Sequence, residues 1–180
     1  MTTRREPATA VERPVLPAGA ACLEGGDLLP AGTRIAVVVS RYNDAVTHGL
    51  LAGAVSTLGK AGLAPDRLTV AWVPGAFELP LAADRLAATG RFAAVICLGA
   101  IIRGETSHDQ HIASAVARGI EEAARARGVP IVFGVLTCND LDQAFARAGA
   151  GNGGGNKGTE AAVAAVEMVA LLARFDSREG

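Results

Sequence analysis

Apolar and polar positions alternate along the chain in blocks of two kinds. The first kind is a short, nearly continuous run of Val, Ile, Leu and Ala, found at residues 35–40, 68–73, 93–100 and 131–137. Runs of this length and continuity are typical of strands that are covered on both faces, as in parallel sheets. The pattern therefore predicts four buried parallel strands.

The second kind is a longer stretch with the spacing of an amphipathic helix. Such stretches cover residues 44–61, 76–89, 108–127, 141–148 and 159–173. A glycine follows three of them in the position of a C-terminal cap: Gly62, Gly90 and Gly128. The order of strands and helices predicts a flavodoxin-like, three-layer α/β/α sandwich with a four-stranded parallel sheet and right-handed crossovers.

Two regions depart from this pattern. Residues 1–30 are rich in Pro, Ala, Gly and charge and show no period. We expect a flexible N-terminal extension there, although a tag remnant or an arm that pairs with another subunit would look the same. Residues 148–158 are dominated by glycine, which interrupts the helical pattern and separates the last two helices. Residues 31–180 are expected to form a single α/β domain.

Composition agrees with one globular domain and argues against several kinds of partner. Half of the 180 residues are apolar, which is enough for a sizeable core. The formal net charge of −1 offers no electrostatic basis for binding nucleic acid. No apolar run reaches the ~18 residues of a membrane span, and the N-terminus lacks the apolar core of a signal peptide.

The three cysteines lie far apart and in no metal-binding spacing. Cys97 falls inside an apolar run and is expected to be a small buried hydrophobe. We expect reduced thiols, no metal site and a cytoplasmic protein.

The chemically richest segments follow the predicted strands. Ligands of doubly wound sheets bind at the carboxyl ends of the strands. Those ends correspond here to residues 40–43, 74–78, 99–108 and 137–139. The first three segments hold most of the polar and aromatic side chains that suit chemistry, so a site is predicted at this edge.

The segment R-G-E-T-S-H, residues 103–108, precedes a predicted helix. Thr106 and Ser107 are good N-cap residues. Free N–H groups, the helix dipole and a hydroxyl would together bind an anion, although a plain helix cap is an alternative. His108 in the first turn suits proton transfer. His111 lies three residues on, but a third metal ligand is missing, and His48 is expected to be structural or exposed.

Each of the other candidate site residues could have either a functional or a structural role. Glu78 and nearby backbone amides suit the polar edge of a heterocycle, or Glu78 is an ordinary helix-terminal carboxylate with Phe77 in the core. Tyr42 suits stacking on a flat ring, or is a surface or core tyrosine. Arg147 suits bidentate phosphate binding. As isolated cations, however, Arg147 and Lys157 would be read as solvated surface charges.

Three sequence strings together resemble the lumazine synthase family: V-P-G-A-F-E-L-P at 73–80, G-A-I-I-R-G-E-T-S-H at 99–108 and G-N-K-G-T-E-A-A at 155–162. The resemblance extends over residues 34–175. It implies a transferase of riboflavin biosynthesis that uses no metal or organic cofactor. Such an enzyme condenses 5-amino-6-ribitylaminouracil with 3,4-dihydroxy-2-butanone 4-phosphate to 6,7-dimethyl-8-ribityllumazine, phosphate and water.

The resemblance also implies roles for single residues. Phosphate binding is implied for Glu105, Thr106 and Arg147, and proton transfer for His108. Glu160 is implied to orient Arg147, and Phe133 to reach the site from a neighbouring subunit. The remaining substrate-binding positions implied by the resemblance are Tyr42, Asn43, Ala76, Phe77, Glu78, Ile101, Ile102 and Lys157.

The chain departs from the family pattern in two places. Asp109, Gln110 and His111 follow His108, where the family usually has an aromatic residue and then Asp. The segment 147–157 is about two residues longer than the common form. From this we expect a homopentamer or pentamer pair rather than a 60-subunit capsid. A catalytically weak homologue that binds flavin or lumazine is the alternative function, and an unrelated flavodoxin-like binding domain is a third.

Overall fold

The computed structural model describes residues 17–18, 20–150 and 155–177. Its strands are β1 (Ile35–Ser40), β2 (Leu68–Val73), β3 (Ala94–Ile102) and β4 (Ile131–Cys138). They form one sheet in the order β2-β1-β3-β4, and every pairing is parallel. The predicted four-stranded parallel sheet is confirmed.

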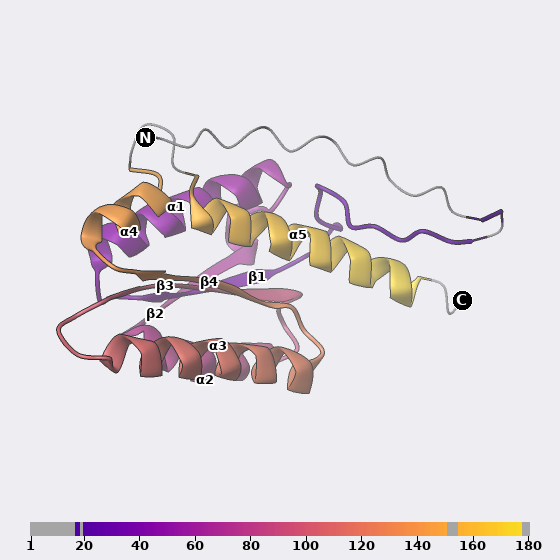
Figure 1. Cartoon of the computed structure of the whole chain (residues 1–180). Helices are drawn as coiled ribbons and strands as arrows, with labels where there is room; N and C mark the ends of the chain where they lie inside the picture. The colour runs from indigo at the N-terminus through magenta and orange to yellow at the C-terminus, as the bar shows by residue number, and fades with distance from the viewer. Residues whose placement is uncertain (1–16, 19, 151–154, 178–180) are drawn as a thin grey trace.

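Helices cover both faces of this sheet (Figure 1). On one face lie α1 (Asp44–Lys60), α4 (Leu141–Arg147) and α5 (Lys157–Asp176). On the other lie α2 (Leu79–Ala87) and α3 (His108–Arg127). The predicted three-layer sandwich is therefore confirmed, and β4 is left as an edge strand.

The central strand β1 shows how the core is built. All six of its residues are buried. Successive side chains point to opposite faces, so Val37 packs in the cluster under α1 and α5, and Val38 in the cluster under α2 and α3. This double burial accounts for the continuous apolar run in the sequence.

Element boundaries differ from the predicted ones for local reasons. The predicted helix 76–89 is a 3₁₀ turn at Ala76–Glu78 followed by α2, whose first turn holds Pro80. Proline has no N–H and fits only at such a helix start. β3 continues past its predicted end to Ile102 because β4 pairs with it there. A further 3₁₀ turn at Pro65–Arg67, before β2, was not predicted.

The described part of the predicted extension contacts α1 and α5. The N–H of Leu29 donates to the carbonyl of Ala61 at 2.9 Å, and residues 26–28 border a hollow of about 250 Å³ between the two helices. Residues 1–16 and 19 lie outside the described residues. The flexible extension over 1–30 and the single domain over 31–180 therefore remain predictions.

The cysteines are free thiols, and two of them are buried. Burial raises the pKa of the Cys97 thiol to about 12 and also raises the pKa of Cys138. The expectation of a buried Cys97 is confirmed. Within the described ranges, none of the helices combines the length and the apolar character that a membrane span requires.

Candidate active site

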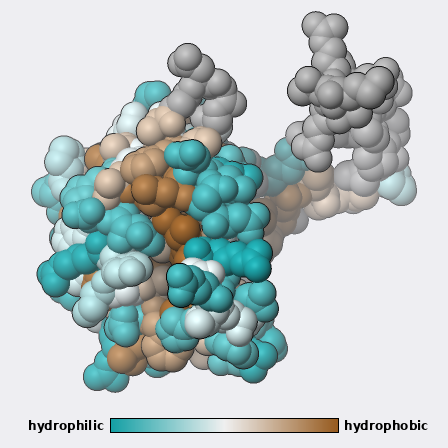
Figure 2. All heavy atoms as spheres, turned by 60° about the vertical axis from the view of Figure 1, so that its left-hand side comes forward, coloured by the Kyte–Doolittle hydropathy of each residue, from teal (hydrophilic) through white to brown (hydrophobic). Residues whose placement is uncertain are grey.

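A cleft of about 410 Å³ opens at the carboxyl ends of β1, β2 and β3. This is the edge at which doubly wound sheets bind ligands. The face of the molecule that carries it has an apolar centre bordered by hydrophilic side chains (Figure 2). Eight of the predicted site residues line the cleft: Tyr42, Asn43, Ala76, Phe77, Ile101, Ile102, Thr106 and His108.

Two aromatic side chains on the cleft wall are largely exposed. Tyr42 is 74% exposed and Phe77 is 60% exposed. The alternative reading of either residue as core is therefore wrong. Ile101 below them is buried, so the cleft combines a closed apolar floor with open aromatic faces, which suits a flat heterocycle.

The turn that carries Tyr42 is tied to both neighbouring strands. The Tyr42 N–H donates to the carbonyl of Pro74 at 3.1 Å. Asn43 adopts the left-handed conformation, with φ 62°, which asparagine tolerates better than most residues. Its Nδ2 donates to the carbonyl of Ala100 at 2.9 Å. The Asn43 side chain therefore fixes the turn from which the Tyr42 ring projects.

Glu78 does not line the cleft. Its Oε2 accepts the backbone N–H of Gly75 at 2.9 Å, across the 3₁₀ turn. This is the helix-terminal role that was the alternative reading. Gly75 itself lines the cleft, so Glu78 shapes the wall, and its contact with a ribityl chain remains a prediction.

The turn before α3 contributes Gly104 and Thr106 to the cleft lining. Ser107 is the N-cap residue but makes no side-chain cap bond. Thr106 Oγ1 instead accepts the N–H of His108 at 3.4 Å. The first turn of a helix favours an anion, and Thr106 and His108 both line this part of the cleft. Glu105 is exposed and lies outside the lining.

Asp109 was noted in the sequence only as a departure from the family pattern. The structure places it in the cleft lining, next to His108. Its Oδ1 is buried and has no hydrogen-bond partner among the described residues. Its place directly after His108, where the family usually has an aromatic residue, is the sequence feature that could have indicated its position in the cleft.

Three further predicted site residues gather in a second hollow together with Glu160. A groove of about 400 Å³ runs along β4 and the ends of α4 and α5, and its lining includes Phe133, Arg147, Lys157 and Glu160. Among the described residues, the groove and the cleft share no lining residue. The fold therefore separates Arg147 from Thr106 within one chain, although both were predicted to bind the same phosphate.

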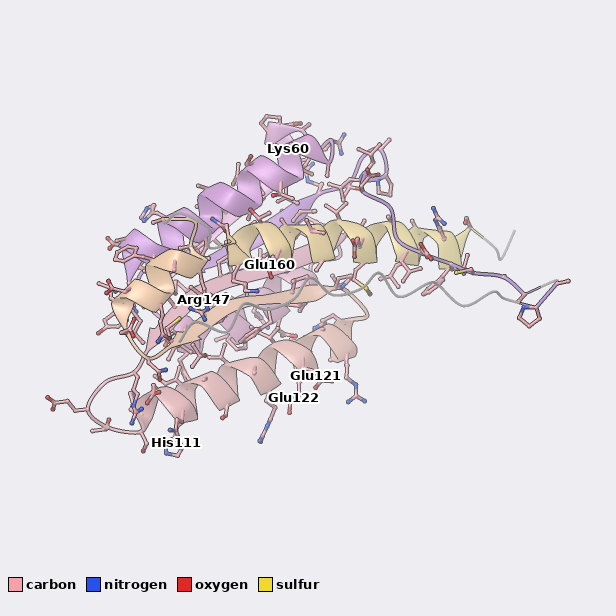
Figure 3. All side chains as sticks on the ribbon, turned by 45° about the horizontal axis from the view of Figure 1, so that its top comes forward. Lys60, His111, Glu121, Glu122, Arg147 and Glu160 are labelled. Atoms are coloured by element: carbon pink, nitrogen blue, oxygen red, sulfur yellow. The ribbon has the colours of Figure 1, made fainter. Side chains whose placement is uncertain are left out.

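The groove carries two cations and one carboxylate. Arg147 is exposed, and its Nη1 donates to the carbonyl of Gln143 at 3.1 Å. Lys157 Nζ pairs with Glu160 Oε2 at 2.5 Å. Figure 3 shows Arg147 and Glu160 close together at the junction of α4 and α5. Phe133, on the edge strand, is 44% exposed. The implied role of Glu160 in orienting Arg147 remains a prediction.

The other two histidines lie outside both hollows. His48 is exposed on α1. Its Nδ1 lies 2.7 Å from the carbonyl of Asp44, and its ring packs against Trp72 with centroids 5.0 Å apart. His111 is exposed on the side of α3 turned away from the sheet (Figure 3). Over the described ranges, no group of three His, Cys, Asp or Glu side chains is placed to hold a metal ion.

Comparison with known families agrees with this architecture. The model of the 6,7-dimethyl-8-ribityllumazine synthase family matches residues 32–173. The matched span holds all four strands, both hollows and every helix except the last residues of α5. The family consists of oligomeric transferases with small-molecule substrates. The match covers most of the chain, and the chain therefore belongs to the 6,7-dimethyl-8-ribityllumazine synthase family.

Proposed function

We propose that the chain condenses 5-amino-6-ribitylaminouracil with 3,4-dihydroxy-2-butanone 4-phosphate to give 6,7-dimethyl-8-ribityllumazine, phosphate and water. The observation that carries this proposal is the cleft at the strand ends. An exposed aromatic ring, an apolar floor, a helix N-terminus and a histidine converge there within the matched family span.

In this proposal the pyrimidine ring stacks on Tyr42 above Ile101. Its 5-amino group attacks the ketone carbonyl, and loss of water gives a Schiff base. Elimination of phosphate follows, and the ribitylamino nitrogen then closes the second ring with loss of water. His108, which lines the same cleft, relays protons between these steps, and positioning supplies much of the acceleration.

The phosphate of the ketone binds between two surfaces that one chain keeps apart. The turn at Thr106 supplies N–H groups, and Arg147 supplies a guanidinium that can bind phosphate with two hydrogen bonds. Because Arg147 lies in the β4 groove, a second copy of the chain presents that groove to the cleft. The free edge of β4 and the exposed ring of Phe133 support this arrangement.

Head-to-tail contacts of this kind close into rings. We infer a homopentamer or a pentamer pair rather than a 60-subunit capsid, because the segment 147–157 is longer than the common form. Residues 151–154 of that segment lie outside the described residues. Light scattering that gives a mass of about sixty chains would contradict it.

The first experiment measures turnover with both substrates, following lumazine absorbance above the uncatalysed background. Arg147→Ala is expected to raise the Michaelis constant for the butanone phosphate about 10- to 100-fold, because a hydrogen bond to a charged group contributes about 1.5–3 kcal/mol. The Michaelis constant for the pyrimidine should change little. Arg125→Ala is the matched control, since Arg125 is an exposed arginine of α3 that pairs only with Glu121 among the described residues.

Equal effects of Arg147→Ala on both Michaelis constants would remove Arg147 from the phosphate role. Absence of turnover together with tight binding of riboflavin or lumazine would instead favour the catalytically weak, flavin-binding homologue.

A further inference from the structure

The side chain of Asn156 makes four hydrogen bonds at the junction between α4 and α5. Its Oδ1 accepts the backbone N–H groups of Gly158, at 2.8 Å, and Thr159, at 3.1 Å. Its Nδ2 donates to the carbonyl oxygens of Gly49 and Ala148, both at 2.9 Å. The oxygen caps α5, while the nitrogen joins α1 to the end of α4. Both N–H hydrogens of the amide are used.

Helix α1 leaves room for this amide. Gly49 and Gly53 lie one turn apart on the same side of the helix. A Cβ at Gly53 would overlap the amide of Asn156, and a Cβ at Gly49 would lie 2.7 Å from the carbonyl oxygen of Ala148. The two glycines therefore let α4, α5 and the Asn156 side chain approach the backbone of a helix whose inner face is buried in the core.

We call the two hydrogen bonds from Asn156 Nδ2 the tie. In the sequence, Ala148 and Asn156 lie next to two cations of the groove. Ala148 follows Arg147, and Asn156 precedes Lys157. Ala148 and Asn156 also form an antiparallel bridge, so the two ends of the segment between them are held together. The bridge and the Asn156 amide therefore hold together the backbone next to Arg147 and Lys157, whatever the number of residues between them.

We propose that Asn156 is a positioning residue that holds Arg147 and Lys157 in the groove for a phosphorylated ketone. This inference rests on the proposed function. Asn156 does not line the groove itself, so it acts through the two cations. A pure helix cap needs only the side-chain oxygen, as at Asp140, whose Oδ1 accepts the Gln143 N–H at the start of α4. The two bonds from Nδ2 are the ones that place the cations.

Two substitutions separate the cap from the tie. Asn156→Ser and Asn156→Asp both keep a side-chain oxygen that caps α5. Neither has an amide nitrogen that can reach Gly49 and Ala148. Asn156→Asp adds a negative charge near the groove and Asn156→Ser does not, so an effect common to both comes from the lost tie and not from charge. Circular dichroism and the thermal midpoint define conditions in which each variant is fully folded.

Steady-state kinetics and inhibition by inorganic phosphate are the measurements. In both variants we expect the Michaelis constant for the butanone phosphate and the inhibition constant of inorganic phosphate to rise about tenfold. The Michaelis constant for the pyrimidine and kcat per folded chain should stay within about twofold of wild type. A merely structural role would lower the amount of active protein without this selectivity.

Equal changes in the two Michaelis constants, or an unchanged inhibition constant for phosphate, would overturn the proposal. Failure of the proposed function looks different, because the wild-type chain would then make no lumazine. In that case calorimetric titration with inorganic phosphate tests whether Asn156 positions the two cations. Weaker binding by both variants supports its role, and equal binding or no binding by the wild type refutes it.

Discussion

At the scale of single residues, exposure separates the proposed binding side chains from the packing ones. Tyr42 and Phe77 are apolar rings held open at the cleft, whereas Ile101 beside them is buried. Hydrophobicity alone treats Phe77 and Ile101 alike. Their different roles follow from the turns that carry the two rings out of the core, one of them locked by the bond from Asn43 to Ala100.

Tyr42 provides a direct test of ring stacking. Tyr42→Ala is expected to raise the Michaelis constant for the pyrimidine about tenfold, because aromatic stacking contributes roughly 0.5–1.5 kcal/mol beyond buried area. Tyr42→Phe keeps the ring and should stay within about twofold of wild type. Steady-state kinetics at saturating butanone phosphate measures both.

Since Tyr42 is 74% exposed, neither change should move the thermal midpoint much. If Tyr42→Phe is as impaired as Tyr42→Ala, the hydroxyl and not the ring binds the substrate.

At the scale of elements, the helix ends follow local chemistry. Gly62, Gly90 and Gly128, predicted to end helices, all have positive φ, at 90°, 66° and 63°. Glycine adopts this conformation without steric cost, so the ends of α1 and α3 were predictable, whereas α2 already ends at Ala87, three residues before Gly90. Glycines inside helices are different, because what their missing Cβ does depends on the neighbouring element.

Gly59 and Gly119 make this difference measurable. A Cβ at Gly59 of α1 would meet no atom within 4 Å, whereas a Cβ at Gly119 of α3 would lie 2.8 Å from the Cβ of Pro80 in α2. Gly59→Ala is therefore expected to raise the free energy of unfolding by about 0.5–1 kcal/mol. Gly119→Ala should lower it by about 1–2 kcal/mol, because overpacking outweighs helix propensity.

Urea denaturation at one fixed protein concentration compares the two variants, since subunit association also stabilises the fold. Equal stabilisation by both changes would mean that α2 and α3 move apart at no cost.

At the scale of the whole molecule, the predicted site is divided between two hollows. One chain places His108 in the cleft and Arg147 in the β4 groove. If a site joins the cleft of one copy to the groove of the next, each copy contributes one half to each of two sites. Two variants that each lack a different half can then complement one another.

Mixed oligomers of His108→Ala and Arg147→Ala test this sharing. When equal amounts are dissociated and reassembled together, about a quarter of the sites should receive an intact cleft and an intact groove. Turnover at low butanone phosphate should then exceed the mean of the two parent variants. Mixing without dissociation serves as the control. An activity equal to that mean after reassembly would place both residues of a site in the same chain.

The strands, most of the helices and their layering could be predicted from the sequence alone because each depends on residues that are neighbours in sequence. The period of apolar residues sets strand or helix, and glycine or proline sets many of the ends. The edge at which ligands bind follows from the parallel order of the strands. The three segments that line the cleft were therefore found by their positions at the strand ends, whereas roles for single residues such as Asn43 and Ile101 came from the family resemblance.

Contacts between distant segments decided the rest. The side chain of Asn156 donates a hydrogen bond to Gly49 across 107 residues, and no local sequence pattern predicts that contact. The separation of Arg147 from Thr106, the burial of Asp109 Oδ1 and the local use of Glu78 also depend on how elements pack. Local periodicity decides which face of an element is buried, and only tertiary packing decides which side chains meet in one hollow.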